Sequence, residues 1–297
     1  MNDITNQVTL ISLEQNAGSQ LLDVVRHCEL PSLPTPCMQP EAAAAVKEDD
    51  NSFYVVGVGE KFDEIWKYDF GSGWTRCHHL VEGRSRHCVN FVGSMLYILG
   101  GSANESVLSS VEGYDTLTNT CARMGELLEG VECASCVSYK SSIYVFGGAK
   151  GNGDGTPAIQ VFDVANNSCV LLSRLMPRAQ SLLRAVAWKS FAVLIGPVDS
   201  YLYDFEAQSF HERNQFQVGL IHFGLILMDD RIFVIGGGVD EQDTSGRVIW
   251  KCTSEVRSTS LRSFVKDDPP DWKVEAQLPR SSFVDAYVGL RLPSDWK

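Results

Sequence analysis

The segment Met95-Leu-Tyr-Ile-Leu-Gly-Gly101 sets a pattern that recurs along the whole chain. Four further runs repeat its plan of aromatic, β-branched and aliphatic residues closed by glycine, at residues 53–57, 143–148, 191–196 and 232–237. Such a run bounded by glycine is typical of a buried strand. The first glycines of the five runs lie at 57, 100, 147, 196 and 236, so the intervals are 43, 47, 49 and 40 residues. A period of this length indicates a propeller blade or a solenoid unit.

An aromatic residue followed by aspartate comes after each of the first four runs. These pairs are Tyr68-Asp69, Tyr114-Asp115, Phe162-Asp163 and Tyr203-Asp204, and each leads into a short polar turn. The unit fits two antiparallel strands joined by a tight hairpin, in which the aspartate accepts backbone hydrogen bonds. We expect the aromatic side chains to pack between blades rather than to bind a ligand. Segments with helical periodicity are nearly absent, which excludes helical solenoids and alternating α/β arrays.

The combined pattern resembles the kelch repeat, with its double glycine, later aromatic-Asp pair, tryptophan and Leu-Pro or Met-Pro ending. The endings are Leu175-Met176-Pro177 and Leu278-Pro279; Trp74 and Trp272 fill the tryptophan position, and Cys121, Cys169 and Phe210 stand there in other copies. The resemblance covers nearly all of the chain. It implies an all-β fold, a six-bladed kelch β-propeller of four-stranded antiparallel blades.

Both ends of the chain are needed to complete the sixth blade. The resemblance predicts a single domain, residues 1–297, with blades at about 32–80, 81–128, 129–177, 178–214 and 215–279, and a last blade in which 280–297 joins 1–31. Closing the ring with both termini would remove free sheet edges, which are otherwise prone to pair with other chains. A five-bladed ring with a loose N-terminal tail is the alternative.

Composition excludes several classes of partner. The chain of 297 residues carries 25 Lys and Arg against 37 Asp and Glu, a net charge of −12, which disfavours a nucleic-acid partner. No apolar stretch is long enough for a membrane span, and the N-terminus lacks the pattern of a secretion signal. The nine cysteines are odd in number and scattered, which fits reduced thiols. We therefore expect a cytoplasmic protein that binds neither membrane nor nucleic acid.

The residues that differ between the repeats are the candidates for binding. In a four-stranded antiparallel blade, the loop that enters the blade and the loop after the glycine run lie at the same end. Two of these loops, 149–157 and 238–246, are long, and long loops on a rigid scaffold often carry function. The candidate partner-binding residues at this end are Arg84, Arg86, His87, Asn104, Asn152, Asp154, Arg178, Arg184, Arg213, Asp240, Glu241 and Arg280. Their arginines could pair with carboxylates of an acidic peptide, and solubilising surface charge is the alternative for each one.

Catalytic and metal-binding patterns are weak in this sequence. The six histidines form no HxxxH or HxH unit, and no GxSxG motif precedes a helix. Cys133 and Cys136 lack a second CxxC pair, and positions three apart on a strand point to opposite faces. The loops around Asp154 and Asp240 lack the ligand order of a calcium loop. We expect no catalytic residue, no metal and no cofactor.

The resemblance also implies a function. Kelch propellers of this kind most often form the substrate-recognition half of BTB-BACK-Kelch proteins, which bring a protein or peptide substrate to a cullin-3 ubiquitin ligase. The helices of BTB and BACK domains are not recognisable in these 297 residues, so any association with cullin-3 would be indirect, through regions outside this chain. We expect either a kelch domain from a longer protein or a stand-alone kelch protein. The alternatives are a kelch-type propeller enzyme, such as an oxidase or sugar epimerase, and an actin-binding or cytoskeletal scaffold.

Overall fold

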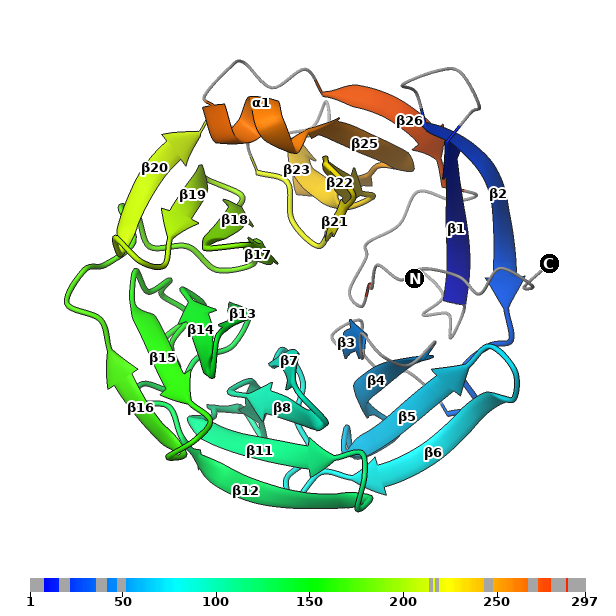
Figure 1. Cartoon of the computed structure of the whole chain (residues 1–297). Helices are drawn as coiled ribbons and strands as arrows, with labels where there is room; N and C mark the ends of the chain where they lie inside the picture. Colours follow the sequence, from blue (N-terminus) through cyan, green and yellow to red (C-terminus); the bar gives the residue numbers. More distant parts are fainter. Residues whose placement is uncertain are drawn as a thin grey trace.

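The strands form a ring of small sheets around one axis (Figure 1). This computed structural model describes residues 8–15, 22–35, 42–46, 52–213, 216, 219–242, 248–266, 272–278 and 287. Five of the sheets have four strands each, and in every one the neighbouring strands run antiparallel. The chain is therefore an all-β propeller, in agreement with the expected fold class.

The five four-stranded sheets are numbered here as blades in chain order. Blade 1 contains β3 (Ala43–Val46), β4 (Ser52–Val58), β5 (Glu64–Asp69) and β6 (Gly73–His79). Blade 2 contains β7 (Cys88–Val92), β8 (Met95–Leu99), β11 (Ser110–Asp115) and β12 (Thr120–Glu126). Blade 3 contains β13 (Ser135–Tyr139), β14 (Ser142–Phe146), β15 (Ile159–Asp163) and β16 (Ser168–Leu171).

The remaining two blades follow the same order from the axis outward. Blade 4 contains β17 (Arg184–Trp188), β18 (Phe191–Ile195), β19 (Ser200–Asp204) and β20 (Ser209–Arg213). Blade 5 contains β21 (Gly224–Met228), β22 (Arg231–Ile235), β25 (Glu255–Ser260) and β26 (Lys273–Gln277). Two hairpins, β9 (Ser102–Ala103) with β10 (Ser106–Val107) and β23 (Gly238–Gln242) with β24 (Val248–Cys252), form separate two-stranded sheets.

The predicted blade count of six is not confirmed. The described residues complete five blades, and β1 (Val8–Gln15) pairs only with β2 (Leu22–Leu30) in a two-stranded sheet. This sheet occupies the arc of the ring between β26 and blade 1 (Figure 1). The inner strands expected within 280–297 lie outside the described residues, apart from Tyr287.

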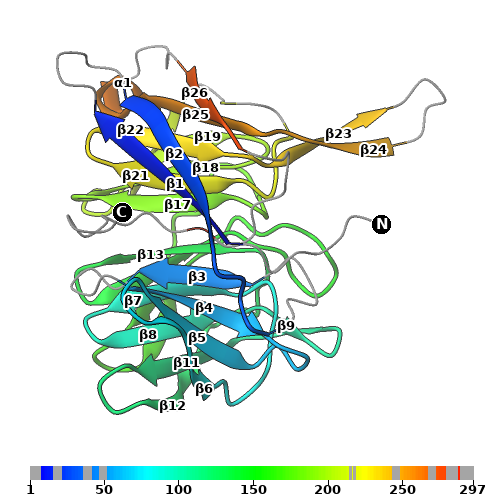
Figure 2. The same cartoon turned by 90° about the vertical axis from the view of Figure 1, so that its right-hand side faces the viewer.

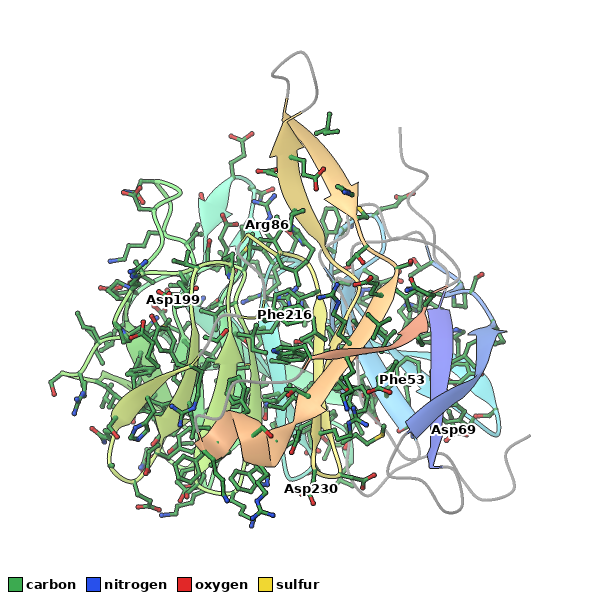
Figure 3. All side chains as sticks on the ribbon, turned by 90° about the horizontal axis from the view of Figure 1, so that it is seen from above. Phe53, Asp69, Arg86, Asp199, Phe216 and Asp230 are labelled. Atoms are coloured by element: carbon green, nitrogen blue, oxygen red, sulfur yellow. The ribbon has the colours of Figure 1, made fainter. Side chains whose placement is uncertain are left out.

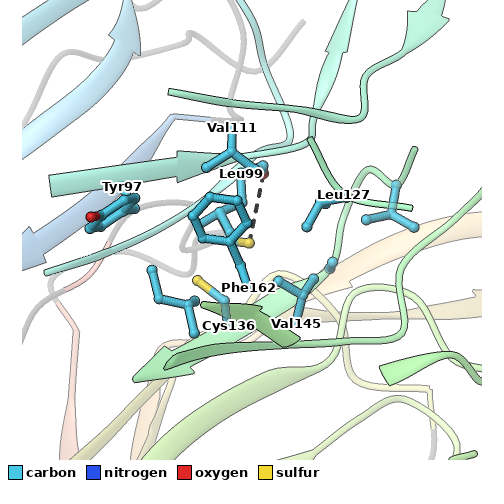
Figure 4. Close-up of a cluster of buried hydrophobic side chains, with 11 residues drawn as sticks. Tyr97, Leu99, Val111, Leu127, Cys136, Val145 and Phe162 are labelled. Atoms are coloured by element: carbon cyan, nitrogen blue, oxygen red, sulfur yellow. Dashed lines mark hydrogen bonds between the residues drawn. The ribbon is translucent and has the colours of Figure 1, made fainter. Parts of the chain in front are cut away.

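The core consists of clusters between neighbouring blades. Strand β8 is buried almost throughout because it has a blade on each side, whereas the outer strand β12 is mostly exposed or half-buried. Figure 4 shows the cluster between blades 2 and 3, where Tyr97 and Val111 face Val145 and Phe162. The repeated aromatic residues Tyr68, Tyr114, Phe162 and Tyr203 are all buried, which confirms their packing role.

The repeated aspartates stabilise the hairpins between the two outer strands, as expected. Asp69 Oδ1 accepts hydrogen bonds from the backbone N of Gly71 and of Ser72 at 2.8 and 3.2 Å. Asp115 and Asp163 accept the equivalent bonds from the residues two positions later, at 2.9 and 2.8 Å. These carboxylates are therefore occupied by their own turns and do not form a catalytic pair.

The second glycine of each intact pair is required by close approach between chain segments. Gly101 has φ +94°, and a Cβ there would lie 2.5 Å from the carbonyl oxygen of Ser85. Gly148 has φ +98°, with the carbonyl oxygen of Glu132 at 2.8 Å from such a Cβ. Only glycine combines this backbone conformation with the space available. The double glycine of the repeat thus lets the loop that enters a blade lie against the loop that follows its second strand.

Helical structure is minor. The helix α1 (Leu261–Lys266) follows β25 and buries Leu261 and Phe264. Within the described ranges, no helix has the length and apolar character needed to cross a membrane.

Candidate functional site

Connecting loops from several blades gather at one end of the propeller. Isolated backbone bridges join Ser85 to Ser102, Glu132 to Ala149 and Ile221 to Gly238, each linking the entry loop of a blade to its post-glycine loop. Figure 2 shows the hairpins of β9 and of β23–β24 projecting from the same side. We call this end the loop face; it comprises residues 82–87, 102–107, 129–134, 149–157, 178–183, 197–200 and 238–242. The predicted placement of both loop sets at one end is confirmed.

The inner strands of the blades enclose a central channel of about 660 Å³. Its wall includes residues from β3, β7, β13, β17 and β21, together with Tyr287. These short inner strands are arranged around the axis of the ring (Figure 1). Entry-loop residues of the loop face, among them Arg86, Cys133 and Leu182, line the channel, so the channel opens at this face.

Four equivalent residues surround the channel where it meets the loop face. Arg86, Cys133, Leu182 and His222 each stand two positions before the inner strand of their blade, with φ of 56°, 53°, 60° and 52°. Backbone hydrogen bonds connect the first three of them: Cys133 N donates to Arg86 O at 2.8 Å, and Leu182 N donates to Cys133 O at 2.9 Å. We call these four residues the mouth ring. Their left-handed backbone conformation turns each entry loop sharply into the inner strand.

The charge of the channel wall is opposite to that of the chain. The described residues that line it include Arg86, Lys140 and Arg184, and no aspartate or glutamate is among them. The whole chain has a net charge of −12. Lys140 lies in the turn between β13 and β14, where it pairs with Glu206 at 2.7 Å. The two arginines therefore supply the positive charge near the mouth ring.

Contacts within the propeller position both of these arginines. The Arg86 side chain is 41% exposed, and its Nη1 lies 3.4 Å from Glu132 Oε2. Arg184 Nε donates to the carbonyl oxygen of Phe223 at 3.1 Å, and its guanidinium lies 5.7 Å from the centre of the Tyr287 ring. Figure 3 shows Arg86 toward the end from which β23 and β24 project, and Asp69 and Asp230 toward the other end. Arg86 is thus placed where a ligand of the loop face could reach it.

Arg84 was predicted to bind a partner, but the structure buries its side chain inside blade 2. Its side chain is 0% exposed, and its guanidinium pairs with Glu112 at 2.5 Å and donates to Ser110 Oγ at 2.9 Å and to the carbonyl oxygens of Gly100 and Ser110 at 3.0 Å. Burial lowers the pKa of Arg84, and the Glu112 carboxylate opposes that effect. Arg84 therefore stabilises the loops of blade 2 from inside. The equivalent pair in blade 3 is Val131 and Gln160.

His87, another predicted binding residue, lines the channel but is largely buried. Its side chain is only 6% exposed and lies against Gly57, where a Cβ would come within 2.4 Å of the imidazole. Burial lowers the pKa of His87 to about 3, with a further contribution from the positive charge of Arg84. The imidazole therefore stays neutral inside the fold, at a position that Ala134, Leu183 and Phe223 occupy in other blades.

Arg213 and Arg178 differ in how available they are. Arg213 donates to the carbonyl oxygens of Phe264 and Val265 in α1 at 2.7 and 2.9 Å, so it connects blade 4 to blade 5 and is not available to a partner. Arg178 is 64% exposed, and its Nε lies 3.2 Å from Asp199 Oδ2. Arg178 remains a candidate for binding. Arg280 lies outside the described residues.

The predicted polar residues on the loops fall into two hairpins and one compact loop. Asn104 and Glu105, with φ of 49° and 62°, form the two-residue turn of the β9–β10 hairpin. In the 149–157 loop, Asn152 Nδ2 donates to Asp154 Oδ2 at 2.6 Å, which fixes the loop through its own side chains. The β23–β24 hairpin carries Asp240 and Glu241, and Lys251 Nζ lies 3.1 Å from Glu241 Oε1. None of these contacts tests a binding role.

Sequence reasoning missed most of the mouth ring. Cys133, Leu182 and His222 share a position and a backbone conformation with Arg86 but not a residue type, so no common letter marks them. Tyr287 lies in the segment expected to complete the last blade and was not singled out in the sequence, and it lines the channel beside Arg184. The signal that could have located the ring is its constant distance of two residues before each inner strand.

Side chains suitable for metal binding are dispersed. Across the described ranges, no group of three or more His, Cys, Asp or Glu side chains is placed to hold a metal ion. Seven cysteines in this part of the chain are free thiols, including both members of the Cys133-x-x-Cys136 motif.

Comparison with known proteins agrees with this architecture. A family model described as "Kelch motif" matches residues 83–128, which include all of blade 2. Kelch-like protein 35 of Mus musculus is 26% identical over 226 residues, which is 75% of this chain and 39% of that protein. Kelch-like protein 35 of Homo sapiens is 33% identical over 132 residues (44% of this chain, 22% of that protein). Kelch-like protein 6 of Homo sapiens is 31% identical over 99 residues (33% and 16%).

A solved structure supports the fold alone. The "Structure of YjhT" aligns with a TM-score of 0.73 at 14% identity, covering 86% of this chain and 88% of that one. The matches to the Kelch-like proteins span less than two fifths of the length of each of those three relatives. The chain is therefore a β-propeller with a kelch motif in blade 2, and it resembles the kelch-repeat propellers of BTB-Kelch proteins.

Proposed function

We propose that this propeller is a non-catalytic recognition module, which binds an acidic segment of a partner protein over the channel on the loop face. The observation that carries this proposal is the charge of the channel wall. Arg86 and Arg184 stand near the mouth ring, and the described lining residues include no carboxylate, although the chain has a net charge of −12. A positive site within an acidic protein favours an anionic ligand locally while the rest of the surface repels it.

The two arginines present different groups to such a ligand. The Arg86 side chain is 41% exposed at the mouth of the channel. Arg184 Nε donates a hydrogen bond to the carbonyl oxygen of Phe223. The two terminal nitrogens, Nη1 and Nη2, would supply the donors for a carboxylate. Guanidinium groups bind carboxylates through two parallel N–H donors, which gives orientation as well as affinity. Arg178 would extend the same surface toward blade 4.

The resemblance to BTB-Kelch proteins supports a wider role. In that role the chain would recognise a substrate for a cullin-3 ubiquitin ligase in the cytoplasm, and BTB and BACK regions outside these residues would contact the cullin. We also propose that the ring closes as six blades, with the segment around Tyr287 supplying inner strands to the β1–β2 sheet. The position of that sheet between β26 and blade 1 supports this closure (Figure 1).

The experiment compares fluorescently labelled acidic peptides with neutral peptides of the same length, using polarisation as the readout. The Arg86→Ala, Arg184→Ala double variant should weaken binding of the acidic peptides by about tenfold or more, because a charged hydrogen bond contributes about 1.5–3 kcal/mol. Arg123→Ala is the matched control, since Arg123 lies on the outer strand β12 and is 55% exposed. Equal affinity in the double variant and the control would disprove the proposed binding site.

Two further measurements separate the alternative functions. Elemental analysis that finds a stoichiometric metal ion in the purified protein would favour a propeller enzyme. Cosedimentation with filamentous actin, abolished when loops 149–157 and 238–246 are replaced, would favour a cytoskeletal scaffold. Binding that needs the two arginines and no metal supports the recognition module.

A further inference from the structure

Two thiols face each other across the boundary between blades 2 and 3. Cys88 is the first residue of β7 and Cys136 is the second residue of β13. These are the inner strands of neighbouring blades, and they lie next to each other around the axis (Figure 1). The side chains are 9% and 7% exposed and belong to one core cluster. Both residues also line the channel, so a small solute in the channel could reach them.

Repeat symmetry explains why the two side chains meet. At the next boundary, Ser135 is the first residue of β13 and Ala185 is the second residue of β17, and Ser135 Oγ accepts a hydrogen bond from Ala185 N at 2.9 Å. A side chain at the first position therefore reaches the second position of the following inner strand. Cys88 and Cys136 occupy these two positions one blade earlier, and both side chains lie in the same core cluster between the two blades.

The immediate surroundings contain little that would compete with the pair. Cys88 Sγ lies 3.8 Å from the carbonyl oxygen of Leu99, the contact dashed in Figure 4, where Cys136 is labelled beside Phe162 and Val145. The other buried members of the cluster are hydrocarbon or aromatic side chains, and the sulfur-containing Met95, Met124 and Cys169 pack against it where they are only partly buried. At the described boundaries between inner strands, only the one between blades 2 and 3 has cysteine at both positions.

We propose that Cys88 and Cys136 form an oxidation site, at which a peroxide joins blades 2 and 3 through a disulfide bond. In the first step, the sulfur of one cysteine attacks a peroxide oxygen, the O–O bond breaks, and a sulfenic acid and one water form. In the second step, the other sulfur attacks the sulfenic sulfur, the S–O bond breaks, and a second water leaves with the thiol proton. The two thiols lose two electrons in total, and hydrogen peroxide gains them.

The environment makes this reaction slow at neutral pH. The neighbouring thiol and burial raise the pKa of Cys136, so little of its reactive thiolate is present. The rate of cross-linking should therefore increase with pH. A site of this kind responds to sustained rather than brief exposure to peroxide.

The bond would lie directly beneath the mouth ring. Arg86 precedes Cys88 by two residues, Cys133 precedes Cys136 by three, and Cys133 N already donates to Arg86 O at 2.8 Å. A disulfide would thus fasten covalently the two blades that this hydrogen bond connects. The proposal does not depend on the recognition function, because it concerns only the joining of blades 2 and 3.

The test treats the folded, full-length chain with hydrogen peroxide at pH 7 and pH 8.5, alkylates the remaining thiols and digests the protein with trypsin without reduction. Cleavage after Arg86, Arg123 and Lys140 places Cys88 with Cys121 in one peptide and Cys133 with Cys136 in another. Mass spectrometry should find these two peptides joined, with a loss of 2 Da relative to their summed masses. The joined product should form faster at pH 8.5 and should raise the unfolding midpoint by about 5 °C or more.

Four single variants identify the atoms involved. Cys88→Ser and Cys136→Ser should abolish the joined product, whereas Cys121→Ser and Cys133→Ser, which remove the other thiol of each peptide, should retain it. A joined product that survives in Cys88→Ser or Cys136→Ser would overturn the proposal. So would oxidation of the wild-type pair to sulfinic acid without cross-linking, or persistence of both free thiols in folded protein after exposed thiols have reacted.

Discussion

Replacing His87 by leucine should make the stability of this propeller less sensitive to acid. The imidazole is buried, and desolvation lowers its pKa from 6.5 to about 3. In the unfolded chain the same group takes up a proton near its ordinary pKa. Between these two values the unfolded state binds a proton that the folded state excludes, so stability falls as the pH decreases from 6.5 toward 3.

The size of the effect follows from the difference in pKa. Each unit corresponds to about 1.4 kcal/mol, so His87 alone should lower the free energy of unfolding by about 2 kcal/mol at pH 5 relative to pH 8. At pH 4 the loss should reach about 3.4 kcal/mol. Leucine is the residue at the equivalent position in blade 4, Leu183, and it carries no titrating group.

Urea unfolding at pH 8, 6.5 and 5 measures this contribution directly. The Leu variant should lose about 2 kcal/mol less than the wild type between pH 8 and pH 5, whatever its stability at pH 8. Substitution of the exposed His211 by glutamine controls for the removal of an imidazole elsewhere. Parallel pH profiles for the wild type and His87→Leu would refute the assignment of a neutral, buried His87.

Three other predictions concern the fold. Glu112→Gln should lower the free energy of unfolding in urea by about 3–5 kcal/mol, because it leaves the buried Arg84 without its counter-charge. Adding Arg84→Val reproduces the pair found in blade 3 and should restore part of this loss. A double variant as unstable as the sum of the two single variants would contradict the prediction. Gly101→Ala should lower the thermal midpoint far more than Gly93→Ala, because a Cβ at Gly93 meets nothing within 4 Å. Equal losses in the two variants would argue against the close approach between Gly101 and Ser85. Deleting residues 1–20 removes β1 and should lower the midpoint of a cooperative melt, whereas an unchanged midpoint would show that β1 does not help to close the ring.

The blades could be predicted from the sequence because each blade is specified by a short pattern of residues that are close together in the chain. A buried strand that ends in glycine, followed by an aromatic-Asp turn, depends on neighbours within one blade, and each of the five runs became the second strand of a sheet. In the fourth run, Pro197 stands where the second glycine of the pair is found in other repeats, and blade 4 nevertheless has four strands. The number of blades depends on pairing between the two ends of the chain, which no local pattern reports.

The candidate site was harder to predict because exposure depends on residues far away in the sequence. Arg84 and Arg86 are two residues apart on the same entry loop, yet Arg84 is buried by Glu112, 28 residues later. Arg213 is likewise taken up by carbonyls of α1, 51 and 52 residues later. Residue type and loop position placed several arginines on the entry loops, but only packing shows which of their guanidinium groups are buried and which are exposed.

At the four positions of the mouth ring, the backbone conformation is the same although the residue types differ. The bonds from Cys133 to Arg86 and from Leu182 to Cys133 run from backbone N to backbone O, so they do not depend on the type of residue at these positions. An arginine, a cysteine, a leucine and a histidine all occupy the same conformation there. If the propeller binds a partner as proposed, mutation at these four positions would change the chemistry presented at the mouth of the channel while these backbone bonds persist. This makes them natural sites for divergence among related propellers and convenient ones for selecting new binding specificities from a library.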